Sequence, residues 1–127
     1  MNLKRVCYIS TAASHIDETS VQKMAEEALT ANRLQDITGL LLFNGVNFWQ
    51  VIEGPSHAID QLMAKIYVDH RHTGIIMRFS ETAMGRWFEN WNLAYKKTSG
   101  VAAESLVNLS IPSQVKAEAD SFMNLAQ

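Results

Sequence analysis

The stretch that decides the fold is FNGVNFWQVIEGP, residues 43–55. Asn44 and Gly45 lie between two apolar runs and form a strong two-residue hairpin signal, because both residue types tolerate positive φ. The run before them, ITGLLLF at 37–43, and the run after them therefore predict two antiparallel strands.

Gln50 is a carboxamide in the middle of a strand that is otherwise nearly all apolar. By alternation it shares a face with Phe48 and Ile52, while Trp49 and Val51 point the other way. A buried Gln without partners costs about 1 to 3 kcal/mol, so something must meet both its C=O and its NH2. Because apolar residues point both ways, both faces of the sheet need a cover.

Hydrophobic periodicity predicts the remaining elements. They are a strand over 5–10, a helix opened by a capping box at Thr19 and Gln22, a helix with Pro55 in its first position, strands over 74–80 and 91–95, and a helix after Pro112. The order is β-α-β-β-α-β with an extra strand. It predicts an α+β, ferredoxin-like sheet with two helices on one face.

A C-terminal helical cover is expected on the other face. The helix after Pro112 carries an apolar stripe of Val115, Ala119, Phe122, Met123 and Ala126. At 127 residues the chain suits one main domain. We expect that domain over 1–98 and a helical extension that packs on the sheet over 99–127.

Composition excludes several classes of protein. The chain is 47% hydrophobic and 19% charged, which is ordinary for a globular protein and indicates neither disorder nor a membrane span. A net charge of -2 and a pI near 6.0 provide no electrostatic footprint for nucleic acid. The single Cys7 cannot form an internal disulfide and the N-terminus has no apolar signal core, so a cytoplasmic location is expected.

Four polar residues converge on the layer between the sheet and the two helices. Tyr8 shares a strand face with Ser10 and is expected to face the helices, as Gln50 does, while Asn32 and Asp69 interrupt the apolar helix stripes. The predicted apolar walls are Val21, Met24, Ile59 and Ile66. Such a layer suits a flat, mostly apolar ligand with an amide-like edge. The alternative is that the amides bond each other or backbone, and that Tyr8 only fills the core.

The stretch DHRHTG at 69–74 invites two further interpretations. His70 and His72 stand at i and i+2 without a third ligand nearby, so no metal site is predicted. Lys65, Arg71 and His72 could form a cationic rim for a phosphate. The alternative is a solvated helix end with favourable basic residues.

Catalysis has little support. The chain has no G-x-S-x-G motif and no glycine-rich phosphate loop. An acylphosphatase-like hydrolase would need an anion-binding loop with Arg after the first strand, and TAASHID at 11–17 has none. These absences count against nucleophilic catalysis and against an acylphosphatase-like hydrolase.

Five short motifs occur together in this chain: Tyr-x-Ser at 8–10, Asn32 with ITG at 37–39, FNGVNFWQVIEGP, DHRH at 69–72 and RWFENW at 86–91. As a set they resemble the BLUF family of blue-light sensors that use flavin. The similarity covers about residues 3–95.

The resemblance implies a noncovalently bound flavin between the two helices, FAD or alternatively FMN or riboflavin. Tyr8 would be the photochemical electron and proton donor, Gln50 the amide whose hydrogen bonds switch, and Asn32 the residue that holds the pyrimidine edge. The expected cofactor-binding residues are Tyr8, Met24, Asn32, Gln50, Lys65, Ile66, Asp69, Arg71 and His72. The output would be conformational, without net catalysis.

Two signalling residues follow from the same resemblance. Trp91 matches the family's tryptophan near the ring, and Leu93 stands where the family usually has Met. The signal would pass to an unknown downstream protein, with a homo-oligomer expected and neither nucleic acid nor membrane as partner. The alternative function is a light-insensitive interaction module of ferredoxin-like fold.

Overall fold

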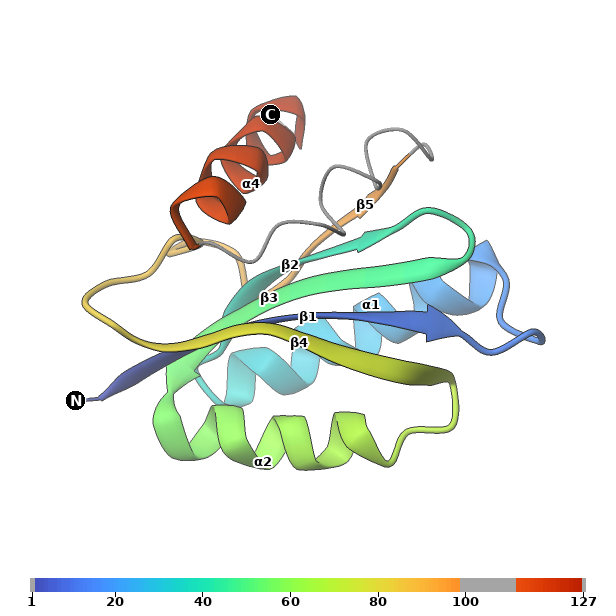
Figure 1. Ribbon diagram of the computed structural model, residues 1–127, viewed down its shortest axis with the longest axis horizontal. Coiled ribbons are helices and arrows are strands. Elements are labelled where there is room, and N and C mark those ends of the chain that lie inside the picture. Colours follow the sequence, from blue (N-terminus) through green and yellow to red (C-terminus); the bar gives the residue numbers. More distant parts are fainter. Residues whose placement is uncertain (1, 99–111, 127) are drawn as a thin grey trace.

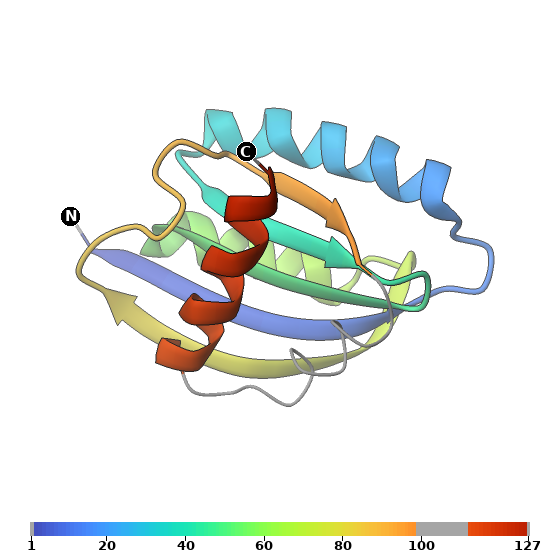
Figure 2. The same cartoon turned by 90° about the horizontal axis from the view of Figure 1, so that it is seen from above.

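The structure of the protein is a computed structural model that describes residues 2–98 and 112–126. Its elements are β1 (Leu3–Ala12), α1 (Glu18–Leu34), β2 (Thr38–Phe43), β3 (Asn47–Pro55), α2 (Ser56–Tyr67), β4 (His72–Ala83), β5 (Ala94–Lys97) and α4 (Pro112–Ala126). Figures 1 and 2 show three layers: α1 and α2 lie on one face of the sheet, and α4 crosses the other face.

The sheet has five strands in the order β4-β1-β3-β2-β5. β3 lies at its centre and pairs antiparallel with both β1 and β2, while β1 also pairs antiparallel with β4. β5 runs parallel to β2 at the far edge. The predicted α+β, ferredoxin-like arrangement with one extra strand is confirmed.

The hairpin between β2 and β3 forms as predicted, but its turn is shifted by one residue. The Asn44 N–H donates to the Asn47 carbonyl at 3.3 Å, so Gly45 and Val46 are the central residues. Gly45 has a φ of 95°, which favours glycine. The Asn44 Oδ1 atom accepts from the N–H groups of Val46 and Asn47, at 2.9 and 2.6 Å. Asn44 therefore occupies the corner of the turn instead of a central position.

Both helix starts also differ from the prediction. Asp17 caps α1, because its Oδ1 accepts from the Ser20 N–H at 2.8 Å, so the capping box at Thr19 and Gln22 was wrong. These hydrogen bonds also lower the pKa of the Asp17 carboxyl. Pro55 is the last residue of β3 and the N-cap of α2, one residue outside the helix.

The core lies on both faces of the sheet. On the helix side Val6 and Tyr8 pack against α2, and Phe43 and Phe48 pack with residues of α1. On the α4 side the cluster consists of Cys7, Ile9, Leu40, Leu42, Trp49, Val51, Phe88, Ala94, Val115 and Ala119. Val115 and Ala119 belong to α4, so this helix covers the sheet face that bears Trp49 and Val51, as expected.

The C-terminal part of the prediction is only partly open to comparison. The side chains of Phe122, Met123 and Ala126 lie outside the described residues. The division of the chain at residue 98 stays a prediction.

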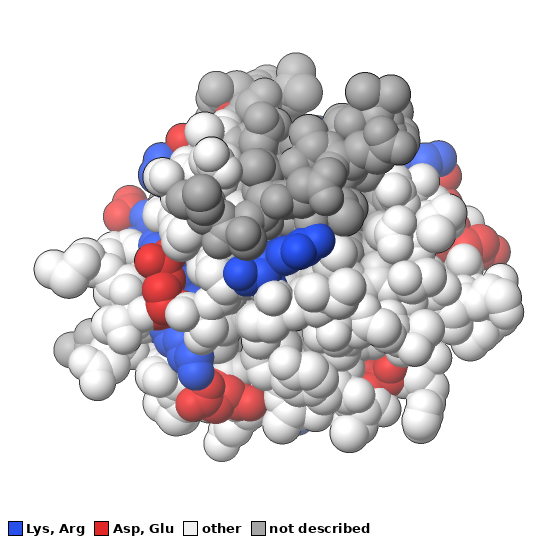
Figure 3. Space-filling view, viewed as in Figure 1, with Lys and Arg blue, Asp and Glu red and all other residues white. Residues whose placement is uncertain are grey.

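Charged side chains of both signs are interspersed on the face shown in Figure 3, mostly toward one end of the molecule. The described part of that face has no continuous basic surface. None of the described helices combines the length and the apolar composition that a membrane span requires.

Candidate functional site

A cavity of about 280 Å³ lies between the sheet and the helices α1 and α2. All nine residues predicted to hold a cofactor line it: Tyr8, Met24, Asn32, Gln50, Lys65, Ile66, Asp69, Arg71 and His72. Six more lining residues were missed as contacts: Glu27, Ala28, Ala31, Leu41, Phe48 and Leu62. Two predicted wall residues, Val21 and Ile59, are fully buried in the core and do not line the cavity.

Tyr8 and Gln50 meet at the floor of the cavity. They are directly paired across β1 and β3, and the Tyr8 hydroxyl donates a hydrogen bond to the Gln50 Oε1 atom. Both residues are buried. The carbonyl end of the Gln50 amide points to Tyr8, so the Gln50 NH2 group faces away from Tyr8 and bonds no other described residue. The cavity therefore presents a buried amide donor to whatever fills it.

The Tyr8 phenol remains protonated at neutral pH. Burial, reinforced by the negative charge of Asp69, raises the pKa of Tyr8 well above its usual value of 10. The phenol is therefore a stable hydrogen-bond donor to Gln50.

Asn32 occupies the wall formed by α1 near the end of that helix. Its Nδ2 donates to the backbone carbonyl of Asn92 at 2.9 Å. The Asn92 side chain in turn donates to the Ile37 carbonyl at 3.0 Å. The Asn32 Oδ1 atom bonds no described residue, so it is a second buried polar atom available to a ligand. Sequence reasoning missed Asn92, because its contribution is a backbone carbonyl on a loop.

An ion pair lies at the side of the cavity where α2 ends. Arg71 donates from Nε to Asp69 Oδ1 at 2.9 Å and from Nη2 to Oδ2 at 2.6 Å. These hydrogen bonds lower the pKa of Asp69 to about 2. Glu27 on α1 approaches the same guanidinium at 3.9 Å. Asp69 therefore orients Arg71, which with Lys65 supplies positive charge to the cavity wall.

His72 is held by two contacts. Its Nε2 lies 2.7 Å from the Ile66 carbonyl and its Nδ1 lies 2.8 Å from the Ser10 Oγ. A carbonyl only accepts, so Nε2 carries a hydrogen, and in the neutral ring Nδ1 accepts from the Ser10 hydroxyl. The geometry ties α2, β4 and β1 together. His72 is thereby fixed in the cavity wall, and its part in a cationic rim with Lys65 and Arg71 stays a prediction.

The predicted signalling residues lie on opposite faces of the sheet. Trp91 packs against the α4-side cluster and does not line the cavity. Leu93 is buried on the α1 side with Val21 and Phe43. Trp91 thus lies outside the cavity lining, and its position near a bound flavin ring stays a prediction. Within the described residues, no group of three His, Cys, Asp or Glu side chains could hold a metal ion.

The cavity fits a flavin ring by its chemistry. Its volume is near the lower end of small-molecule pockets, about 300 Å³. Met24, Leu41, Phe48, Leu62 and Ile66 supply apolar walls for a flat ring system. The amide groups of Gln50 and Asn32 provide a donor and an acceptor for a polar edge.

Comparison with known proteins agrees with this geometry. The family model described as "BLUF: Sensors of blue-light using FAD" matches residues 3–94. The photoactivated adenylate cyclase subunit beta of Euglena gracilis is 35% identical over 95 residues, which are 72% of this chain and 11% of the relative. The blue light- and temperature-regulated antirepressor BluF of Escherichia coli is 39% identical over 79 residues, 59% of this chain and 20% of the relative.

A solved structure supports the same assignment. BlrB, described as a BLUF protein in its dark state, is 28% identical, with a TM-score of 0.83 over 99% of this chain and 98% of its own. The chain spans only about a tenth of the Euglena cyclase subunit and a fifth of the antirepressor. The paired Tyr8 and Gln50 at the cavity floor agree with the family match over residues 3–94, and on that match this chain belongs to the BLUF family.

Proposed function

We propose that the protein is a blue-light sensor that binds a flavin noncovalently in the cavity between α1, α2 and the sheet. The observation that carries the proposal is the buried hydrogen bond from Tyr8 to Gln50, which leaves the Gln50 NH2 for a ligand. Cys7, the one cysteine of the chain, is buried on the opposite face of the sheet. No thiol is therefore placed for covalent attachment.

The photochemical roles fall to Tyr8 and Gln50. A bound flavin supplies the absorption of blue light and an acceptor for one electron and one proton. Tyr8 would be the residue that supplies the electron and the proton and then recovers both, so no net chemistry would result. The Gln50 amide, whose NH2 is available in the cavity, would hold the polar edge of the flavin and would be left rearranged, by rotation or by tautomerisation. The output is conformational, and the domain acts as a sensor without catalysis of its own.

The remaining wall residues bind and orient. Asn32 would hold the polar edge of the ring, and Met24 and Ile66 would provide apolar walls for it. Lys65 and Arg71 would hold its phosphate, with Asp69 orienting the Arg71 guanidinium. We propose FAD as the native flavin, with FMN and riboflavin as alternatives that share the ring.

The signal passes, in this proposal, to a partner protein in the cytoplasm, and the protein works as a homo-oligomer. Trp91 and Leu93 are the proposed signalling residues, since they lie on the two faces of the sheet near its β5 edge. Neither nucleic acid nor membrane is proposed as a partner.

Illumination of the purified protein tests the proposal. The wild type should be yellow and should show a reversible red shift in blue light. Gln50→Leu and Tyr8→Phe should still bind flavin but lose the shift. Heat or acid should release all of the flavin, and chromatography then identifies it.

Two results would count against this function. A Gln50→Leu protein with the full shift would rule out the amide switch. A wild type that binds flavin but shows no red shift in blue light would favour the alternative function, a light-insensitive interaction module.

A further inference from the structure

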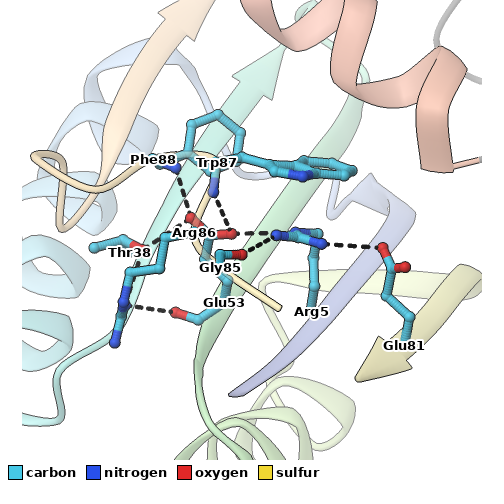
Figure 4. A network of polar contacts seen from close by, with 8 residues as sticks. All are labelled: Arg5, Thr38, Glu53, Glu81, Gly85, Arg86, Trp87 and Phe88. Carbon is cyan, nitrogen blue, oxygen red and sulfur yellow. Dashed lines mark hydrogen bonds and ion pairs between the residues drawn. The ribbon is translucent and has the colours of Figure 1, made fainter. Parts of the chain in front are cut away.

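A row of four polar residues crosses the sheet on the face that bears α4. Glu81, Arg5, Glu53 and Thr38 are directly paired across β4, β1, β3 and β2. Figure 4 shows Arg5 between the two carboxylates, with the Trp87 ring beside its guanidinium. Glu53 is 0% exposed and Arg5 only 4%. A charged pair this deeply buried needs complete hydrogen bonding.

Glu53 receives four hydrogen bonds, and two of them come from the backbone of the loop after β4. Arg5 Nε donates at 3.1 Å and Thr38 Oγ1 at 3.1 Å, while the N–H groups of Trp87 and Phe88 donate at 2.9 and 2.6 Å. Hydrogen bonds to an ionised carboxylate are about twice as strong as neutral ones. Glu53 therefore tethers this loop to the middle of the sheet.

Arg5 adds further contacts to the same loop. Its Nη2 donates to the Gly85 carbonyl at 2.5 Å, and its guanidinium carbon lies 3.8 Å from the centre of the Trp87 ring. Its Nη1 donates to Glu81 at 3.1 Å. Residues 85–88 are thus held by side chains of β1 and β3, in addition to the chain connection to β4.

The continuation of this segment reaches the cavity. The Trp91 carbonyl accepts from the Gly39 N–H at 3.0 Å, and the Asn92 carbonyl accepts from Asn32, a cavity residue, at 2.9 Å. The Phe88 side chain lies in the same buried cluster as Val115 and Ala119 of α4. Segment 85–92 therefore contacts the cavity wall at one end and the core under α4 at the other.

We propose that Glu53 is a positioning residue that holds segment 85–92 in place, so that a change at the Asn32 wall of the cavity reaches α4. The proposal rests on the light-sensing function proposed above. Its physical basis is that a segment transmits a displacement only when it is anchored against a rigid element, and Glu53 anchors it to the central strands. Glu53 does not line the cavity, so flavin photochemistry does not depend on it.

Glu53→Gln isolates the tether. All four partners of Glu53 are donors, so a Gln NH2 must face two of them. The Thr38 hydroxyl can turn and accept, whereas Arg5 cannot, so the NH2 is expected toward Thr38 and Phe88. The Phe88 N–H then loses its acceptor, and the loop is released where it meets the α4-side core.

Two further variants sharpen the comparison. Glu81→Gln is the matched control, because it makes the same substitution on the other carboxylate partner of Arg5 but touches no loop backbone. Glu53→Asp keeps the charge beside Arg5 and shortens the side chain by one methylene, which withdraws the carboxylate from the two loop amides. Glu53→Asp replaces Glu53→Gln in the test if the Gln variant fails to fold.

Amide hydrogen exchange over residues 112–126 provides the test. It is measured on the full flavin-loaded chain in the dark and under blue light, and the red shift of the flavin absorption is recorded for the same samples. All variants should keep the wild-type red shift. Wild type and Glu81→Gln should show a light-dependent change in exchange. In Glu53→Gln and Glu53→Asp that light-dependent change should be reduced at least about fivefold, because fivefold is the lower end of the usual coupling between two sites.

Several outcomes would overturn this assignment. They are an unchanged light response in the Glu53 variants, an equal loss in Glu81→Gln, or a wild type whose red shift is accompanied by no change over 112–126. Faster exchange throughout the sheet with the light response kept would make Glu53 merely structural. A wild type without a red shift would instead refute the sensor function itself.

Discussion

A double-mutant cycle on Tyr8 and Gln50 would measure the hydrogen bond on which the proposed site depends. The cycle comprises wild type, Tyr8→Phe, Gln50→Leu and the double variant. Phenylalanine keeps the ring and removes only the hydroxyl, and leucine keeps much of the volume of Gln50 without donors or acceptors. The two residues are directly paired across β1 and β3, so no other residue stands between them.

The expected magnitudes follow from burial. Tyr8 is 4% and Gln50 7% exposed, so either partner left alone keeps a buried polar atom without its bond. Each single substitution should therefore lower the free energy of unfolding by about 1 to 3 kcal/mol. The double variant removes both polar groups, so its loss should be smaller than the sum of the single losses. We expect a coupling energy of about 1 to 2 kcal/mol.

Urea unfolding of the flavin-free protein supplies the four free energies, with the flavin-loaded series measured in parallel. Using flavin-free protein matters, because ligand binding would add its own stabilisation. If the losses were additive within about 0.5 kcal/mol, Tyr8 and Gln50 would not be bonded, and the proposed switch would lose its structural basis.

Three further predictions test other parts of the structure. Gly39→Ala should lower the free energy of unfolding by at least about 2 kcal/mol, because a Cβ at position 39 would lie 2.3 Å from a β3 carbonyl oxygen. Gly85→Ala is the control and should be nearly neutral, because a Cβ there would meet no atom. Equal melting temperatures of the two variants would contradict this. Arg71 lowers the pKa of Asp69 to about 2, so the carboxylate of the folded protein stays ionised at pH values where that of the unfolded chain binds a proton. Wild type should therefore be more stable than Asp69→Asn above about pH 4. That advantage, about 1 kcal/mol for a partly exposed pair, should vanish as the pH falls toward 2, and a pH-independent difference would refute it. Asn32→Ala should weaken flavin binding by about 1 to 3 kcal/mol in a titration, and an unchanged dissociation constant would mean that Asn32 does not meet the ring.

Alternation along the strands was enough to predict the faces of the sheet. It assigned Tyr8 and Gln50 to the helix side and Trp49 and Val51 to the other, and the structure agrees. Local side-chain hydrogen bonds were harder to predict. Asn44 was expected at the centre of the turn, but its side chain accepts two backbone N–H groups and so takes the corner.

The cavity could be predicted further than the loop beside it. Its residues lie on helices and strands, whose periods place side chains on known faces. The loop after β4 has no such period, so neither the Asn92 carbonyl that meets Asn32 nor the position of Trp91 followed from the sequence. Backbone acceptors in particular leave no signature in residue type.

The spacing of Gln50 and Glu53 explains why the buried row was missed. Side chains three residues apart on a strand point to opposite faces, because the period of a strand is two. The motif Gln-x-x-Glu therefore cannot form a single site: Gln50 faces the cavity, while Glu53 faces α4 and holds the loop amides. A close pair in the sequence thus marks two different tasks on the two faces of one strand, and only the register of β1, β2 and β4 shows what the second task is.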